Sequence, residues 1–219
     1  MITRFQDAPF ANVGCLDITV GGAGGIGGPL LLCLSRLQHN IEFYENDVVG
    51  EENLGTQLFK YSDVDRPKAD VIGDLLEDYS NNVPTHLGTF EEDSFVNPYC
   101  FAAFDNMAAR KMMYFQWKKL TDKKIFIDCR LIAESWQIIA ITKEEQMEIY
   151  EKEYLFDDSE VEDLQCTYKA TFHNSLIIGG MAVAIFTNYL TNQVWEDNIR
   201  EVPLFTSFDI PTLKLRSKV

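Results

Sequence analysis

A run of glycines between two apolar segments restricts the fold of this chain more than any other feature. Residues 16–20 have the composition of a buried strand, residues 30–37 that of a helix, and Gly21–Gly28 joins them. Glycine lets the backbone turn tightly and approach a phosphate closely, and a following helix offers free N–H groups. The segment therefore predicts a nucleotide-binding strand–turn–helix unit. Its candidate contact residues are Gly22, Gly24, Gly25 and Gly27.

Strand-like and helix-like segments alternate along most of the chain. Further strands are expected at 41–44, 83–90, 99–104, 125–128 and 137–142, and further helices at 67–79, 106–120 and 175–191. This alternation predicts an α/β fold, with a Rossmann-like, mostly parallel sheet flanked by helices. We expect antiparallel strands and a crossing segment toward the C-terminus. We treat residues 1–219 as one domain, with a nucleotide-binding half at about 14–130 and a crossing segment, cysteine loop and C-terminal helix at about 143–219.

The charge of the chain disfavours one class of partner. The sequence has 19 Lys and Arg against 34 Asp and Glu, a net charge of −15. Such a chain repels phosphate backbones, so nucleic-acid binding is not expected. Residues 143–163 are especially acidic. They predict a solvated or partly disordered crossing segment, and the alternative is a docking surface for a basic partner.

The five cysteines are odd in number and form no Cys-x-x-Cys pair. A disulfide framework and a cysteine-rich zinc site are therefore poor interpretations, and a reducing, cytoplasmic location is expected. The N-terminus lacks the apolar core of a signal peptide. The longest apolar stretch, 176–190, is short and interrupted by glycines, Thr187 and Asn188, so it predicts a buried helix and no membrane span.

An acidic residue ends the second predicted strand. Glu45 lies 18 residues after Gly27, where an acid often takes ribose hydroxyls. The glycine loop alone does not distinguish ATP from NAD. The chain has only three histidines and no Tyr-x-x-x-Lys arrangement after the fifth strand, which argues against an NAD oxidoreductase.

Five further blocks, in order, resemble the ThiF/MoeB/HesA family, which includes the adenylation domains of ubiquitin-activating enzymes. The blocks are 45–49, 53–57, 63–68, 104–110 and 166–171 with His173 following. The resemblance covers roughly residues 14–190 and implies a minimal ThiF-like adenylation domain without the zinc clip. It implies ATP-dependent adenylation of the C-terminal carboxylate of a ubiquitin-like or sulfur-carrier protein with a Gly-Gly tail. It also implies ATP and Mg²⁺ as ligands and a homodimer.

The resemblance assigns roles to individual side chains. Lys68 matches the basic residue at the phosphates, and the alternative is an ordinary surface lysine. Asp105 matches the Mg²⁺ ligand, and the alternative is a cap on the helix that follows, although Asn106 is the better cap. Arg110 has a mostly structural role in the family. The remaining nucleotide-binding candidates are Glu45, Asp47, Asn53 and Gln57, the last two one helical turn apart.

The chain departs from the family pattern at Thr56, where the family has a phosphate-contacting arginine. Lys60 or Arg66 could supply the missing charge. Arg4 is a candidate for the N-terminal arginine that reaches into the neighbouring subunit's site in dimers. The departure keeps open an alternative function, a weakened ATP-binding scaffold subunit. Another alternative is adenylation of a small molecule or a tRNA base.

Cys166 matches the family's thiol nucleophile, which receives the acyl group as a thioester. Positive charge from Lys169 and a nearby helix start would lower its pKa and favour the reactive thiolate. Cys129 is the second candidate nucleophile, while His173 is expected to be a core residue. The other cysteines lie in or beside apolar segments and are expected in the core: Cys15, Cys33 and Cys100.

Overall fold

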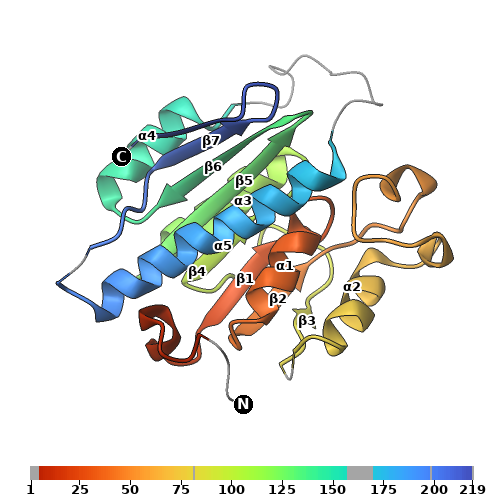
Figure 1. The fold of residues 1–219 in the computed structure, drawn as a ribbon, viewed down its shortest axis with the longest axis horizontal. Coiled ribbons are helices and arrows are strands. Elements are labelled where there is room, and N and C mark those ends of the chain that lie inside the picture. Colours follow the sequence, from red (N-terminus) through yellow and green to blue (C-terminus); the bar gives the residue numbers. More distant parts are fainter. Residues whose placement is uncertain (1–4, 81, 157–169, 198, 219) are drawn as a thin grey trace.

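A computed structural model describes residues 5–80, 82–156, 170–197 and 199–218 (Figure 1). Its eight strands form one sheet in the order β3-β2-β1-β4-β5-β6-β7-β8. The strands are β1 Asp17–Gly21, β2 Asn40–Tyr44, β3 Thr85–His86, β4 Tyr99–Ala102, β5 Ile125–Ile132, β6 Ser135–Ile141, β7 Phe205–Asp209 and β8 Lys214–Lys218. The first five pair in parallel, and β6, β7 and β8 extend the sheet with antiparallel pairs. The predicted α/β fold with a mostly parallel sheet is confirmed.

Helices cover both faces of the sheet. The α-helices are α1 Gly27–Ser35, α2 Lys68–Glu77, α3 Met107–Lys119, α4 Glu144–Glu153 and α5 Phe172–Val194, and the short 3-10 helices are η1 Pro9–Asn12, η2 Glu51–Asn53 and η3 Tyr61–Asp63. Helices α1 and α5 pack side by side on one face, and α3 and α4 lie on the other (Figure 1). The side chains of β4 alternate between the two cores, with Phe101 facing α1 and α5 while Cys100 and Ala102 face α3 and α4.

The strand order reverses beside β1, which is where a ligand crevice is expected. The chain runs from β1 outward to β2 and β3, and then returns to the other side of β1 as β4. Connections that leave the carboxyl ends of adjacent strands in opposite directions create a crevice there, and open α/β sheets bind ligands at this point. The glycine loop and Asp105 follow β1 and β4, so the fold brings both to that crevice.

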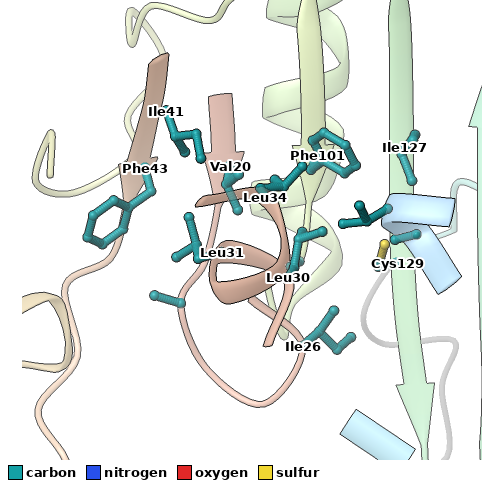
Figure 2. Close-up of a cluster of buried hydrophobic side chains, with 14 of the residues drawn as sticks. Val20, Ile26, Leu30, Leu31, Leu34, Ile41, Phe43, Phe101, Ile127 and Cys129 are labelled. Carbon is teal, nitrogen blue, oxygen red and sulfur yellow. The ribbon is translucent and has the colours of Figure 1, made fainter. Parts of the chain in front are cut away.

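The core around α1 is mainly aliphatic (Figure 2). Ile26, Leu30, Leu31 and Leu34 of this segment are buried against the sheet, where Val20, Ile41, Phe101 and Ile127 meet them. Burying one such side chain stabilises the fold by about 1.5–3 kcal/mol. The glycine loop is therefore anchored at its helical end by a dense apolar contact.

Helix α5 is held against α1 by a glycine. A Cβ atom on Gly179 would lie 2.8 Å from Pro29 Cβ and 2.9 Å from Leu30 N, so only glycine allows the two helices this close. By length and composition α5 could cross a membrane, but 61% of its most apolar window is buried within the protein. This burial agrees with the expected buried helix.

Several sequence expectations differ from the structure. The strand expected at 83–90 is limited to Thr85–His86, and the acidic segment contains a helix, α4. Met147 and Tyr150, three positions apart, bury one side of that helix, and Gln146 Oε1 accepts the backbone N–H groups of Thr142 and Lys143. Cys15 is exposed and is not a core residue, because it precedes β1 at the surface. The acidic run 157–163, Cys166, Lys169 and Arg4 lie outside the described residues.

Candidate functional site

Two glycines of the loop are required by the close packing of their neighbours. Gly22 has a φ of +89°, and a Cβ there would lie 2.8 Å from the carbonyl oxygen of Ala103, just after β4. A Cβ on Gly27 would overlap the carbonyl oxygen of Gly22. Larger residues at these two positions would therefore separate β1 from β4 or α1 from the loop.

The middle of the loop is open. A Cβ on Gly24 would come nearest to Gln57, and one on Gly25 nearest to the Ser175 hydroxyl, each at an ordinary contact distance of 3.5 Å. Among the described residues, no hydrogen bond uses the N–H groups of Gly24, Gly25 or Ile26. These groups lie at the N-terminus of α1, whose partial positive charge favours an anion. The loop can therefore hold a phosphate.

Glu45 braces the loop from the end of β2. Its Oε2 accepts the Ala23 N–H at 2.8 Å, and its Oε1 accepts the N–H groups of Asn46 and Asp47 at 2.9 Å each. The carboxylate is partly exposed, and Oε2, which accepts one hydrogen bond where Oε1 accepts two, can accept a second. Glu45 thus lies where ribose hydroxyls are expected, and its role toward the sugar stays a prediction.

Lys68 is buried and is paired with another predicted site residue. Its exposed fraction is 6%, and its Nζ lies 3.0 Å from Asp47 Oδ2. Its backbone N–H also donates to the carbonyl of Asp47 at 2.8 Å. The surface-lysine interpretation is wrong, because a bridge between Val48 and Pro67 draws the start of α2 against the segment after β2. A buried ammonium exerts a stronger field than an exposed one, which suits a site for phosphate charge.

The amide side chains of Asn53 and Gln57 differ in their hydrogen-bond partners. The N–H of Gln57 donates to the Asn53 carbonyl at 2.9 Å, which confirms that the residues are one turn apart. Asn53 Oδ1 accepts the Gly50 N–H at 2.9 Å, whereas Gln57 Oε1 is buried beside Gly24 without a partner. Since buried polar atoms normally have partners, this orphaned oxygen points to a ligand group at the loop.

Asp105 carries an exposed carboxylate at the carboxyl edge of the sheet. The adjacent Asn106 contacts it at 3.2 Å through Nδ2, and Asn106 Oδ1 accepts the Ala109 N–H at 2.8 Å. Asn106 is therefore the cap of α3, and the capping interpretation of Asp105 is wrong. Among the described residues no three His, Cys, Asp or Glu side chains form a metal-binding group. A single carboxylate that shares a cation with phosphate oxygens and waters is an arrangement typical of Mg²⁺.

Both candidates for the missing family arginine contact the buried Asp63. Arg66 forms ion pairs with Asp74 at 2.5 Å and with the buried Asp63 at 3.5 Å. Lys60 is exposed, and its backbone N–H donates to Asp63 at 2.8 Å. The backbone carbonyl of Thr56 accepts the Ser175 hydroxyl of α5 at 3.2 Å, and the Thr56 hydroxyl donates to the Asn53 carbonyl at 3.5 Å. The compensating charge from Lys60 or Arg66 stays a prediction.

The cysteine and histidine expectations have mixed outcomes. Cys100 is buried, as expected, and Cys33 is half-buried. Cys129 is fully buried, and burial raises the pKa of its thiol, which excludes it as an accessible nucleophile. His173 is exposed beside Thr171 and is not a core residue, because it projects from the first turn of α5.

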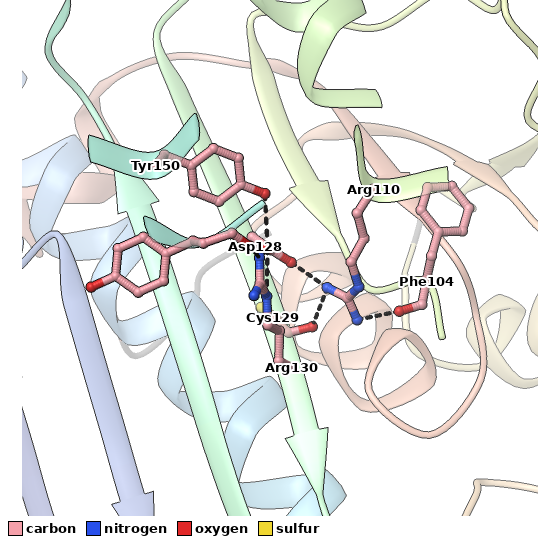
Figure 3. Close-up of polar contacts among 7 residues, drawn as sticks. Phe104, Arg110, Asp128, Cys129, Arg130 and Tyr150 are labelled. Atoms are coloured by element: carbon pink, nitrogen blue, oxygen red, sulfur yellow. Dashed lines mark hydrogen bonds and ion pairs between the residues drawn. The ribbon is translucent and has the colours of Figure 1, made fainter. Parts of the chain in front are cut away.

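Sequence reasoning missed a buried ion network behind the site (Figure 3). Asp128 of β5 is fully buried and forms ion pairs with Arg110 of α3 and with Arg130 of β5, the latter at 2.5 Å. The Tyr150 hydroxyl donates to it at 2.9 Å. Burial alone would raise the pKa of Asp128, but the two arginines hold that pKa below its ordinary value. The available signal was two opposite charges, two positions apart, in an otherwise apolar strand.

Comparisons with known proteins support the architecture. The sequence model of the ThiF family matches residues 3–218. No curated protein matches this sequence. Among solved structures, PaaA superposes with a TM-score of 0.65 at 15% identity, over 96% of this chain and 64% of PaaA. MccB of E. coli, solved with ATP, gives a TM-score of 0.66 at 14% identity, over 97% of this chain and 65% of MccB.

A further structure shows the same fold with another ligand. The microcin C7 biosynthetic enzyme MccB in complex with N-formylated MccA gives a TM-score of 0.68 at 12% identity, over 97% of this chain and 66% of that one. At these identities the likeness shows the fold. The chain spans about two thirds of the length of these neighbours.

Proposed function

Because the chain belongs to the ThiF family, we propose that it activates a carboxylate by adenylation with ATP. The observation that carries the proposal is the set of groups around the glycine loop. The open N–H groups of Gly24 and Gly25 belong to the loop, and the orphaned Gln57 oxygen lies beside Gly24. The exposed carboxylate of Asp105 follows Phe104, whose ring packs at Gly21, and the buried ammonium of Lys68 is linked to the loop through Asp47 and Glu45. These groups suit a triphosphate and its counter-ion.

The proposed acceptor is the C-terminal carboxylate of a ubiquitin-like or sulfur-carrier protein with a Gly-Gly tail. One structural neighbour, MccB, was solved with AMPCPP and MccA together, so that fold accommodates a second molecule beside a nucleotide. A C-terminal carboxyl has a pKa of about 3.3–3.7 and is ionised at neutral pH. The acceptor therefore needs no general base.

In the proposed reaction a carboxylate oxygen attacks the α-phosphorus of ATP. The bond between the α-phosphorus and the bridging oxygen breaks, and pyrophosphate leaves with the bonding electrons. The loop N–H groups hold the phosphates, and Lys68 stabilises the charge that develops on the leaving group. Mg²⁺, which Asp105 would hold, neutralises phosphate charge when bound. The product is an acyl-adenylate.

Transfer to Cys166 is a second proposed step. The thiolate attacks the acyl carbon, the bond from that carbon to the AMP oxygen breaks, and AMP leaves with the electron pair, giving a thioester. The proposal also includes a homodimer in which Arg4 reaches the neighbouring site. Both residues lie outside the described part of the chain, so support for these steps comes from the sequence resemblance alone.

A weakened, ATP-binding scaffold is the second candidate function. It is favoured by Thr56, which replaces the family arginine and directs its carbonyl to α5. Such a subunit would keep the nucleotide-binding loop, and its rate of adenylation would be low. Binding without turnover is its distinguishing property.

ATP–pyrophosphate exchange with a Gly-Gly-ended carrier tests the proposal. We expect exchange that needs the carrier, and a loss of about 10²–10³-fold in both Lys68→Met and Asp105→Asn. Lys119→Ala, which changes an exposed lysine on α3, is the control and should keep the wild-type rate. ATP binding without exchange would favour the scaffold, and absence of ATP binding would contradict both functions.

A further inference from the structure

The buried ion network adjoins the turn that carries Asp105. We infer that Asp128 is a positioning residue for the Asp105 carboxylate and acts on it through Arg110. The inference rests on the proposed function, in which Asp105 holds Mg²⁺. It concerns residues that do not touch the substrate, and it gives a role to the charged side chains that are buried beside the sheet.

Arg110 joins three points of the fold (Figure 3). Its Nη1 donates to Asp128 Oδ1 and, at 2.7 Å, to the carbonyl of Cys129 on β5. Its Nη2 donates to the carbonyl of Phe104, the residue before Asp105. One guanidinium therefore ties the turn after β4 to the neighbouring strand β5.

Asp128 makes this arrangement possible. Arg110 is only 6% exposed, and a buried guanidinium without a counter-ion is strongly disfavoured. Asp128 also accepts from Arg130 Nε at 2.8 Å and from the Tyr150 hydroxyl at 2.9 Å. Arg130 and Tyr150 share Oδ2 of this carboxylate, and the other oxygen, Oδ1, accepts from Arg110 and fixes its orientation.

The Asp105 turn is also held on its other side. The Ala103 N–H donates to the Gly21 carbonyl at 2.7 Å, and the Phe104 ring fills the space where a Gly21 Cβ would be. The backbone at Asp105 is thus tied to β1 on one side and to β5 on the other, while its carboxylate stays exposed. A rigid backbone beneath an accessible carboxylate is what a preorganised metal ligand needs.

Arg130 supplies a control within the same network. It bonds the same carboxylate as Arg110, but its Nη2 donates to the Tyr154 carbonyl at 2.8 Å and its guanidinium lies 5.4 Å from the centre of the Phe156 ring. These contacts lie after α4 and do not involve the Asp105 turn. Lysine at either position keeps the charge and loses the forked geometry, so the two variants differ in which segment is released.

The test is the Mg²⁺ dependence of ATP binding by the full chain, measured by calorimetry alongside thermal unfolding. In Arg110→Lys we expect the half-saturating Mg²⁺ concentration to rise about 10-fold or more, the usual effect of removing a partner behind a metal ligand. Asp128→Asn should show the same shift if it folds. Arg130→Lys should shift it less than about 2-fold, even where its melting temperature falls as much as that of Arg110→Lys.

Three results would overturn the inference. Equal Mg²⁺ shifts in Arg110→Lys and Arg130→Lys would show that the network acts only through stability. An unchanged Mg²⁺ dependence in Arg110→Lys would remove the positioning role and leave the proposed function intact. A wild-type chain that binds ATP equally well with and without Mg²⁺ would overturn this inference together with the metal role of Asp105.

Discussion

The two faces of the sheet are stabilised in different ways. On the α1–α5 face, aliphatic side chains meet, and Gly179 lets the helices approach within contact of Pro29. On the α3–α4 face, aromatic rings pack against one another, among them those of Tyr114 and Tyr150. The carboxylate of Asp128 is buried on the same face and forms ion pairs with two arginines. The first face depends on shape, and the second depends on charge balance as well.

This difference matches what each face supports. The shape-dependent face carries the glycine loop, where the backbone must come close to a ligand. The charge-balanced face carries the Asp105 turn, where one side chain must be held at a fixed place. The first face should therefore be sensitive to added atoms, and the second to a missing partner.

The largest effect is expected on the charge-balanced face. Asp128→Ala leaves Arg110 and Arg130 buried without their counter-ion, and should lower the free energy of unfolding by about 3–5 kcal/mol. Urea denaturation measures the loss. Asp122→Ala, at an exposed position after α3, should change stability by less than about 0.5 kcal/mol. A loss below about 1 kcal/mol for Asp128→Ala would contradict the view that this face depends on charge balance.

A pair of neighbouring glycines tests the shape-dependent face. Gly179→Ala places a Cβ 2.8 Å from Pro29 Cβ and should cost about 1–3 kcal/mol. Gly180→Ala has no heavy atom within 4 Å of the new Cβ, and should stabilise the helix by up to about 1 kcal/mol. Thermal unfolding of both variants gives the comparison. Similar melting temperatures would mean that the contact between α1 and α5 is less close than described.

Acid titration should separate the faces, with the smallest expected effect. Burial beside Phe186 on the α1–α5 face lowers the pKa of His39 from 6.5 to about 4. Between these values the unfolded chain binds a proton that the folded chain does not, so stability falls as pH falls, by up to about 1.4 kcal/mol per pH unit. Asp128 has a lowered pKa, so its contribution is present above its ordinary value near 3.8 and is lost only at lower pH.

The variant His39→Asn checks the assignment of the upper pH window. It should flatten the dependence of unfolding free energy on pH between about 6.5 and 4. Urea denaturation at a series of pH values gives that dependence. An unchanged slope would assign the window to other groups.

The parts of the fold with strong local signals could be predicted from the sequence. The glycine run was correctly placed between a strand and a helix, β1 and α1. Lys68 and Asp105 were singled out by motifs that occur in the family's order, and their roles stay predictions. Helix α4 was missed because its acidic exposed side hides the spacing of Met147 and Tyr150. The strand expected at 83–90 is shorter in the structure because it lies at the edge of the sheet. Only Thr85 and His86 pair there, with Glu42 and Phe43 of β2.

Contacts between distant parts of the chain could not be predicted. The partner of Arg110 comes from a strand that follows its helix, and nothing local to either residue indicates the pair. The burial of Lys68 depends on the bridge between Val48 and Pro67. The motif gave the residue types of the candidate site, while their exposure and their hydrogen-bond partners come from tertiary packing.

The order of strands also has a consequence during synthesis. Gly22 emerges from the ribosome long before Ala103, yet the crevice exists only when the two lie against each other. A nascent chain that ends before β4 contains every loop glycine but only one wall of the crevice. Such non-local pairing slows folding and leaves the edge of β1 unpaired until β4 arrives. A truncated translation product would therefore carry the whole glycine motif and still lack the crevice.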